Sequence, residues 1–457
     1  MGTKLMAMRM AYDMSRAKKG GAEAVTARQQ RRLADLVAYA RRHSRFYGEK
    51  YQHLPEQVTD LRQLPVVTKR ELMNRFEDWV TDPEITRKGV EAFVADLQNV
   101  GRDYLGRYAV WTTSGSTGTP AILIHDQKSL AVMTAMSLVH GAYTMQEMLA
   151  IFRQGARIAG VYATGGHYYG YAMIRRRVLE EPRKAKSFKI FSVLEPLPEL
   201  VKSLNELRPA MLGGYASALQ VLAQEQKAGR LNIHPVLVNN GGEYLSPGAR
   251  AEIEAAFGAK VLNNYSCSEA ATMGFDCGHG WMHVPADWVI LEPVDEHYQP
   301  VPAGQMSHSV LVTYLGNRVQ PVIRYEVTDR VMVNPEPCAC GSSLPAIRVE
   351  GRTDDTLSLA GAGGAPVRVL PLAFLAVVKE TPGVKGYQVI QTGPAALRLR
   401  LETKPGADRA AVWGAVRERM ASFLAHQGAA ACELSLDSEL PAADPKSGKF
   451  RHVMVAM

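Results

Sequence analysis

The sequence predicts an α/β protein with a large N-terminal domain, built on mostly parallel sheets, and a small α+β C-terminal domain. Three observations lead to this fold class. The chain has 457 residues and 46% hydrophobic composition, enough for more than one core. Between Ser192 and Ser266, strand-like and helical runs alternate at the length of β–α units. After residues 351–357 the chain continues in an α+β order, so the predicted domains are 1–352 and 353–457.

The N-terminal part is expected to contain helices and then a pair of strands. Residues 25–47 place apolar side chains at helical spacing with arginines on the other side, which is typical of an amphipathic helix. Thr68 and Glu71 have the spacing of a capping box, so a helix is expected to begin after Thr68. The runs 107–111 and 121–126 predict two strands on either side of one loop.

The later elements follow from apolar spacing and from start and stop residues. Ser246 and Pro247 are typical of the start of a helix, and Gly258 of its end. Strands are expected at 209–215, 235–240, 260–266, 385–392, 396–403 and 431–437, and helices at 198–207, 216–229, 371–380 and 409–427.

Charge and cysteine content narrow the class of protein. The formal charge of +8 is spread along the chain, so small anionic ligands explain it at least as well as nucleic acid does. No apolar run approaches the ~18 residues that cross a bilayer, and charged residues interrupt the basic start, which predicts a soluble, cytoplasmic protein without a signal peptide or membrane partner. Five cysteines favour metal binding or reduced thiols over disulfides.

The loop "TSGSTGTP", residues 113–120, has the composition of a phosphate-binding turn. Glycine lets backbone amides approach phosphate oxygens, and the neighbouring hydroxyl groups add donors. The loop lacks the Gly-Lys-Ser/Thr end of a Walker loop. On composition alone a flexible surface loop is the alternative, whereas two flanking strands would give the turn a rigid base.

A series of segments, in order, resembles the motifs of the adenylate-forming superfamily of acyl-CoA synthetases, adenylation domains and luciferases. Residues 113–120 resemble its phosphate loop, with Ala121 in place of the usual lysine. Further matches are "NNGGEYLS" (239–246), "NNYSCSEA" (263–270), "IRYEVTDR" (323–330), "GRTDDTL" (351–357) and "PKSGKFR" (445–451). The N-terminal "RRLADLVAYARRHSRFY" and "LRQLPVVTKREL" are similar specifically to the phenylacetate-CoA ligase branch.

The resemblance implies a nucleotide site. Ser114, Gly115, Ser116, Thr117 and Gly118 would hold the pyrophosphate end of ATP, and Gly241, Gly242, Glu243 and Tyr265 would enclose the adenine. Asp329 would bind the ribose hydroxyls, Arg352 the ribose or the phosphates, and Ser268 takes the place of a threonine. Glu326, Val327 and Thr328 depart from the superfamily's "R-T-G". Core packing is the alternative for Tyr265.

The resemblance also implies the catalytic groups. Glu269 and Thr117 would bind Mg²⁺, which prefers oxygen ligands, and Lys449 would bridge the attacking carboxylate and the phosphate as a mobile positive charge. Asp354 matches a hinge about which the C-terminal domain turns, so that one site serves adenylation and then thiol transfer. A solvated surface position is the ordinary alternative for Glu269 and for Lys449.

An acyl pocket is expected from two aromatic segments, 162–170 and 213–219. Tyr162, His167, Tyr168 and Tyr215 could line a slot that accepts an aromatic group. Tyrosines also fill ordinary cores, so core packing is the alternative for these residues.

Cysteine and histidine spacing predicts a structural zinc site. Cys277 and His283 lie in "CGHGWMH", and Cys338 and Cys340 form a C-x-C in "EPCACGSS". Three thiolates and one imidazole would close a tetrahedral site with no open position. His279 competes with His283 as the fourth ligand, and three buried free cysteines are the alternative to a metal site.

Together these features predict an ATP-dependent carboxylate-CoA ligase that makes an acyl-adenylate with release of pyrophosphate and then a thioester. ATP and Mg²⁺ are expected with CoA as co-substrate, and an aromatic acid is the substrate that the resemblance implies. One alternative passes the acyl group to a carrier protein or an amine. Another, of a different class, is a non-catalytic zinc-containing nucleic-acid-binding protein, against which Glu269 and Lys449 argue.

Overall fold

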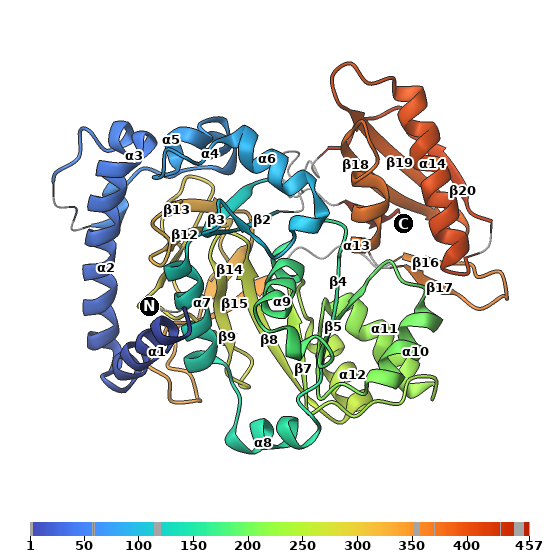
Figure 1. Ribbon diagram of the computed structural model, residues 1–457, viewed down its shortest axis with the longest axis horizontal. Coiled ribbons are helices and arrows are strands. Elements are labelled where there is room, and N and C mark those ends of the chain that lie inside the picture. Colours follow the sequence, from blue (N-terminus) through green and yellow to red (C-terminus); the bar gives the residue numbers. More distant parts are fainter. Residues whose placement is uncertain are drawn as a thin grey trace. The chain divides into compact units, whose positions relative to one another are not determined.

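The structure is a computed structural model that describes residues 3–56, 58, 60–113, 120–350, 357–369, 371–429, 431–442 and 452–456 (Figure 1). The chain forms two compact units, each assembled from three segments. The first unit contains Met1–Thr113, Ala121–Thr144 and Leu262–Gly351, and the second contains Ser114–Pro120, Met145–Val261 and Arg352–Met457. This division reflects compactness alone. The predicted domains, 1–352 and 353–457, stay a prediction.

Helices begin the first unit. They are α1 (Thr3–Lys19), α2 (Gly21–His43), α3 (Arg45–Lys50), α4 (Lys69–Asn74), α5 (Phe76–Trp79) and α6 (Arg87–Ala95), with 3-10 turns at Leu61–Gln63 and Leu97–Asn99. A further helix, α7 (Gln127–His140), follows the first strands and packs against α1.

Local sequence signals set the ends of these helices. The predicted amphipathic helix is α2, which buries an apolar face that includes Leu36. It ends at Ser44, whose hydroxyl accepts a hydrogen bond from the Tyr47 amide and caps α3. Thr68 Oγ1 accepts from the Glu71 amide at 3.3 Å, so the predicted start of α4 is confirmed.

The strands of the first unit are antiparallel. One sheet contains β1 (Asp103–Tyr104), β2 (Tyr108–Thr112) and β3 (Ile122–His125), and another contains β11 (Val289–Val294), β12 (Ser309–Tyr314) and β13 (Val322–Val327). In a third region β8 (Lys260–Cys267), β9 (Ala271–Asp276), β10 (Met282–His283), β15 (Ala346–Glu350) and β14 (Arg330–Val333) lie side by side in that order. Val67 adds a parallel bridge to Tyr325 of β13.

Parallel strands form the sheet of the second unit. Their order is β5 (Phe188–Ser192), β4 (Ile158–Tyr162), β6 (Met211–Gly214) and β7 (Leu237–Gly241). The helices of this part are α8 (Met145–Arg153), α9 (Tyr169–Glu180), α10 (Leu197–Leu207), α11 (Ala216–Lys227) and α12 (Pro247–Phe257), with a 3-10 turn at Pro182–Lys184. Leu204, Leu212, Leu219, Val238 and Ile253 belong to one buried cluster between these helices and the sheet.

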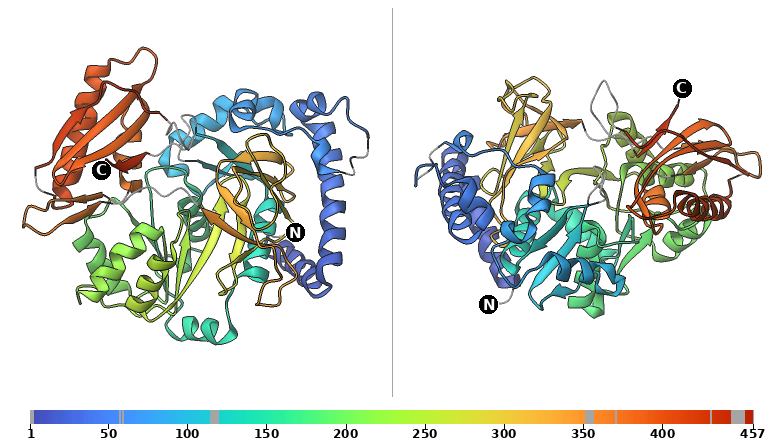
Figure 2. Two further views of the ribbon diagram at one scale, coloured as in Figure 1. Left: turned by 180° about the vertical axis from the view of Figure 1, so that it is seen from behind. Right: turned by 90° about the horizontal axis from the view of Figure 1, so that it is seen from above.

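The C-terminal part of the second unit has its own sheet and core. Its strands are β16 (Leu357–Leu359), β17 (Val367–Val369), β18 (Val384–Gly393), β19 (Ala396–Thr403), β20 (Glu433–Leu436) and β21 (Val453–Val455). Its helices are α13 (Pro371–Phe374), a π-helical turn at Leu375–Lys379 and α14 (Arg409–His426). The sheet order is β20-β19-β18-β21, and α14 packs on one face of it (Figure 2).

The predicted α/β class with a small α+β C-terminal region is confirmed. The helix predicted after Ser246 is α12, where Ser246 Oγ accepts from the Ala249 amide at 3.1 Å and Gly258 follows with a φ of +60°. Parallel pairing joins β5 to β4, β4 to β6 and β6 to β7, whereas β8 and β9 pair antiparallel. None of the described helices is long and apolar enough to cross a bilayer.

Candidate functional site

The predicted site residues are distributed over both units. Tyr265, Ser268, Glu269, Asp329, Cys277, His283, Cys338 and Cys340 belong to the first unit, and Tyr162, His167, Tyr168, Tyr215, Gly241, Gly242 and Glu243 to the second. Ser114, Gly115, Ser116, Thr117, Gly118, Arg352, Asp354 and Lys449 lie outside the described residues.

Glu269 lies in the tight turn between β8 and β9. The turn contains Ser268, Glu269 and Ala270, and Ala271 follows with a φ of +57°. A left-handed residue at the end of a three-residue turn is a common way to close a hairpin. Although it lies in a turn, Glu269 is only 7% exposed, which differs from a solvated surface acid.

Two side chains from other strands hold this turn. The Tyr325 hydroxyl of β13 donates a hydrogen bond to Glu269 Oε1 at 2.7 Å. The Trp111 indole of β2 donates to the Ser268 carbonyl at 2.7 Å and stacks on His125, with the ring centroids 4.2 Å apart. Burial lowers the pKa of His125 to about 3, so the imidazole is neutral and serves packing.

Asp329 is also bound by a tyrosine. The Tyr265 hydroxyl donates to Asp329 Oδ2 at 3.0 Å, and Tyr265 is buried. The structure thus brings together two motif segments that lie more than sixty residues apart in sequence. Each of the two acids, Glu269 and Asp329, receives a hydrogen bond from an uncharged donor.

Sequence reasoning missed Trp111 and Tyr325 as supports of this site. Both lie inside segments that the sequence singled out, because Trp111 precedes the loop 113–120 and Tyr325 is part of "IRYEVTDR". The signal that could have identified them is a large aromatic residue with a polar atom in a strand beside a motif, since a buried hydroxyl or indole group needs a partner.

A second cluster contains three cysteines and one histidine. The ligand atoms of Cys277, His283, Cys338 and Cys340 all lie within 4.8 Å of one another. Cys277 Sγ is 3.8 Å from Cys338 Sγ, and His283 Nε2 is 3.1 Å from Cys340 Sγ. The donor set, three sulfurs and one imidazole nitrogen, suits a tetrahedral Zn²⁺ site.

The antiparallel pairing of β9 and β10 selects the histidine of this cluster. His283 faces Phe275 across the two strands, and its Nδ1 lies 2.9 Å from the Leu344 carbonyl. A hydrogen bond at that nitrogen leaves Nε2 for a metal ion. His279 is exposed in the connecting turn and is not part of the cluster, so His283 is the histidine that joins the three cysteines.

In the second unit, two of the predicted pocket tyrosines pack together. The rings of Tyr162 and Tyr215 meet edge to face with centroids 5.2 Å apart. Gly242, with a φ of +86°, lies so close to Tyr215 that a Cβ there would be 3.1 Å from the ring. Gly242 from the predicted adenine segment and Tyr215 from the predicted acyl segment are therefore neighbours.

The two other pocket residues lie in the loop between β4 and α9. His167 is buried, and the Tyr168 hydroxyl donates to Glu380 Oε1 at 3.3 Å. A Cβ at Gly165 would lie 2.5 Å from the Glu380 carboxylate oxygens, so a larger residue there would displace the Glu380 carboxylate. Burial raises the pKa of Glu380 to about 7.

Glu243 points back into its own unit. One carboxylate oxygen accepts a hydrogen bond from the Ser217 amide at 2.9 Å, and the Glu243 carbonyl accepts from the Asn240 side chain at 2.9 Å. Burial raises the pKa of the Glu243 carboxyl. These bonds fix the turn that follows Gly241, the last residue of β7, and contains Gly242.

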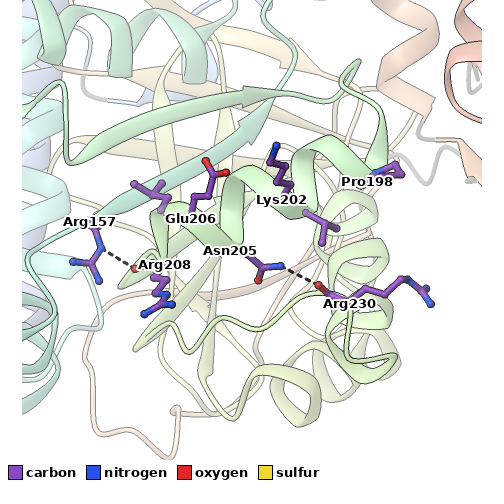
Figure 3. A pocket seen from close by; sticks show the side chains of 9 residues that line it. Arg157, Pro198, Lys202, Asn205, Glu206, Arg208 and Arg230 are labelled. Atoms are coloured by element: carbon purple, nitrogen blue, oxygen red, sulfur yellow. Dashed lines mark hydrogen bonds between the residues drawn. The ribbon is translucent and has the colours of Figure 1, made fainter.

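An open surface pocket of about 740 Å³ lies elsewhere in the second unit (Figure 3). The Arg157 guanidinium donates to the Arg208 carbonyl at 2.9 Å, and the Asn205 amide donates to the Arg230 carbonyl at 2.9 Å. The other lining residues are Pro198, Val201, Lys202, Glu206 and Leu207. None of the predicted site residues that the structure describes lines this pocket.

The ends of the loop 113–120 are held together as predicted. Thr112 of β2 pairs with Ile122 of β3, and the Thr113 amide donates to the Ala121 carbonyl at 3.0 Å. Ala121 is 2% exposed, so the position at which the superfamily usually has a lysine is buried here.

Comparison with known proteins bears on the fold. No family profile matches the chain. Over 319 residues, 67% of its length, it is 22% identical to protein CapK of Staphylococcus aureus, and the match covers 63% of that protein. The chain thus spans less than two thirds of the length of this curated relative.

Solved structures of 2-hydroxyisobutyryl-CoA ligase are similar along nearly the whole chain. The complex with 2-HIB-AMP and CoA in the thioesterification state has a TM-score of 0.58 at 21% identity, covering 95% of this chain and 89% of that chain. The postadenylation state with R3-HIB-AMP has a TM-score of 0.53 at 22% identity, at the same coverage. The chain has the fold of these acyl-CoA ligases of the adenylate-forming superfamily, as the motifs predicted, and the phenylacetate-CoA ligase branch stays a prediction.

Proposed function

We propose that this chain is an ATP-dependent carboxylate-CoA ligase of the AMP-forming type, with an aromatic acid as substrate. The observation that carries the proposal is the buried Glu269, fixed in its turn by Tyr325, within a chain whose fold is that of acyl-CoA ligases. The reaction joins a carboxylate to the α-phosphate of ATP, releases pyrophosphate and then forms a thioester. Because the reactants are anionic, positioning and charge stabilisation supply most of the catalysis.

The proposed nucleotide contacts follow the motifs. The amides and hydroxyls of Ser114 to Gly118 would bind the pyrophosphate end, and Asp329 would accept hydrogen bonds from the ribose. Gly241, Gly242 and Tyr265 would pack on the adenine, with Glu243, Ser268 and Arg352 beside the nucleotide. The bond from Tyr265 to Asp329 supports this set, because it fixes two of its members against each other.

Glu269 and Thr117 are the proposed ligands of Mg²⁺. The Glu269 side chain fits this role, because Tyr325 occupies Oε1 and no donor to Oε2 is found among the described residues. When bound, Mg²⁺ would neutralise charge on the phosphate oxygens.

Lys449 is the proposed catalytic lysine, and Asp354 the hinge about which residues 353–457 would turn. An ammonium group at a developing negative charge stabilises the transition state more than the ground state. We expect Lys449→Ala to slow acid-dependent pyrophosphate release at least ~100-fold, whereas Lys446→Ala, a nearby control, should keep it. Unchanged release in Lys449→Ala would refute this mechanism.

The acyl pocket is proposed from Tyr162, His167, Tyr168 and Tyr215. The edge-to-face rings of Tyr162 and Tyr215 favour an aromatic acid, since a third ring can extend such an arrangement. The neighbouring ligase was solved with 2-HIB-AMP, so 2-hydroxyisobutyrate belongs in any substrate panel.

Zn²⁺ is proposed at Cys277, His283, Cys338 and Cys340 as a structural ion. The four ligands leave no open position, and the cluster joins the β9–β10 turn to the segment between β14 and β15. Its role would be to tie these two hairpins together.

The decisive experiment is acid-dependent release of pyrophosphate across a panel of aromatic, aliphatic and 2-hydroxy acids, with product masses measured. CoA, a carrier protein and simple amines are offered in separate reactions. We expect an aromatic acyl-CoA as the product. Adenylate that forms without acyl-CoA would overturn the acceptor, and absence of pyrophosphate release with every acid would overturn the proposed activity.

A further inference from the structure

The strand that precedes Asp329 contains an irregularity at Arg324. β12 and β13 pair in register from Val310 with Val327 to Val312 with Tyr325, and the register then shifts before Tyr314 pairs with Val322. One residue of β12 therefore faces two residues of β13, which is a β-bulge. Arg324 has a φ of +47°, a left-handed conformation that is rare for arginine.

Several contacts hold Arg324 in this conformation. Its amide donates to Thr313 Oγ1 at 2.9 Å, and its carbonyl accepts from the Val67 amide at 3.0 Å. Arg324 is 6% exposed, and its Nε donates to Glu292 Oε2 at 3.1 Å. The guanidinium also donates to the Leu64 carbonyl. A left-handed arginine costs about 1–3 kcal/mol, so contacts of this number are what keeps it in place.

The bulge determines where the next side chain points. An extra residue in one strand changes the face on which the following side chains lie, and bulges beside active sites often redirect a functional group in this way. Tyr325 follows Arg324 directly, is 3% exposed and reaches Glu269 Oε1 at 2.7 Å. The contact joins residues 56 positions apart in sequence.

A tyrosine hydroxyl is a better partner for a metal-binding Glu269 than a positively charged side chain would be. A tyrosine hydroxyl is uncharged, so it orients the carboxylate without cancelling its negative charge. Within the described residues Glu269 has no ion pair with lysine, arginine or histidine. The Trp111 indole of β2 donates to the neighbouring Ser268 carbonyl, a second contact that restrains the turn beside Tyr325.

We propose that Tyr325, directed by the bulge at Arg324, is a positioning residue that holds Glu269 Oε1 and leaves Oε2 for the magnesium ion of Mg·ATP. The inference rests on the proposed function and gives a role to Tyr325, a residue of the segment "IRYEVTDR" to which the resemblance assigned none. It predicts that removing one hydroxyl group weakens Mg·ATP binding although the carboxylate itself is unchanged.

The test measures Mg·ATP binding by calorimetry in the absence of any acid, so that no turnover occurs. We expect Tyr325→Phe to raise the dissociation constant about tenfold, as for loss of a hydrogen bond to a charged group. Tyr47→Phe is the matched control, because Tyr47 is equally buried in the same unit and its hydroxyl donates to the Pro321 carbonyl at 3.1 Å. That variant should bind Mg·ATP like the unmodified chain.

A double-mutant cycle separates positioning from general loss of structure. In a Glu269→Gln background, which removes the metal ligand's charge, Tyr325→Phe should change the dissociation constant less than twofold. A tenfold effect in both backgrounds, or none in either, would overturn the role of Tyr325. If Tyr325→Phe has no effect in either background, pyrophosphate release by the unmodified chain would still leave the proposed function standing. If the unmodified chain neither binds Mg·ATP nor releases pyrophosphate, both fail together.

Discussion

The two ends of strand β9 are built in contrasting ways. At one end is the Glu269 turn, where each close contact joins a donor and an acceptor, as in the bond from Tyr325 to Glu269. At the other end Cys277 faces Cys338 with the sulfurs 3.8 Å apart. Burial, followed by the neighbouring thiols, raises the pKa of Cys277 to about 11.

The difference leads us to propose which end depends on an added ion for its stability. The Glu269 turn is fixed by the protein's own hydrogen bonds, so an ion there can come and go with the nucleotide. In the cysteine cluster the Cys277 thiol donates to the Trp281 carbonyl at 3.2 Å, and a cation that converts the three thiols to thiolates would bind them more strongly than such contacts do. We therefore propose a catalytic role for the first end and a structural role for the second.

Removing the ion from the cysteine cluster should have the largest effect on stability. We expect about one zinc per chain by elemental analysis, lost in Cys340→Ala or with a strong chelator, together with a fall of about 10 °C in the unfolding midpoint. Cys432→Ala is the control, because Cys432 lies outside the cluster. A metal-free chain with an unchanged midpoint would contradict the structural role.

Neutralising the carboxylate at the opposite end should affect activity and leave stability nearly unchanged. In Glu269→Gln the side-chain oxygen can still accept from Tyr325, while the charge is lost. We expect pyrophosphate release to fall about 100-fold with a shift of less than about 2 °C in the unfolding midpoint. The exposed Glu296→Gln is the control. A large loss of stability without loss of activity would reverse the assignment of the two ends.

The smallest effect concerns the other tyrosine and carboxylate pair, Tyr168 and Glu380. The folded-state pKa of Glu380, about 7, lies above its ordinary value of 4.5. The folded chain therefore holds a proton that the unfolded chain releases, and stability falls as pH rises from about 4.5 through about 7. Two groups act on the pKa of Glu380 besides burial: the Tyr168 hydroxyl, through its hydrogen bond, and Arg419, through its charge.

Glu380→Gln should flatten this part of the pH profile. Allowing for partial exposure of the carboxyl group, we expect a difference of about 1 kcal/mol in the free energy of unfolding between about pH 5 and about pH 8, measured with urea. Glu418→Gln, an exposed position on α14, should keep the slope of the unmodified chain. If Glu380→Gln and the unmodified chain show the same dependence of the free energy of unfolding on pH, this carboxyl group is not the source of that dependence.

Signals that act over a few residues were sufficient to predict much of the fold. The start of α12 at Ser246 and its end at Gly258 depend on neighbouring backbone groups, so the sequence alone identifies them. The hairpin around the loop 113–120 was equally predictable from its flanking apolar runs. Glu269 was expected directly after a strand, and it follows β8 closely.

Contacts between distant segments were not predictable in the same way. The bond from Tyr325 to Glu269 depends on the bulge at Arg324, and no sequence signal assigns a left-handed conformation to an arginine. Similarly, the sequence favoured His283 as the fourth ligand but left His279 as a competitor. The pairing of β9 with β10 decides between them, because it places His283 in a strand and leaves His279 in the exposed turn.

The interleaved first unit has a consequence for biosynthesis. Residues near the N-terminus depend on partners that are translated much later, since the Trp79 indole donates to the Pro321 carbonyl at 2.6 Å and Val67 bridges to Tyr325. At bacterial or eukaryotic elongation rates, roughly 240 further residues take of order tens of seconds to emerge from the ribosome. During that interval Trp79 lacks its native partner, so the nascent N-terminal helices are a natural substrate for chaperones.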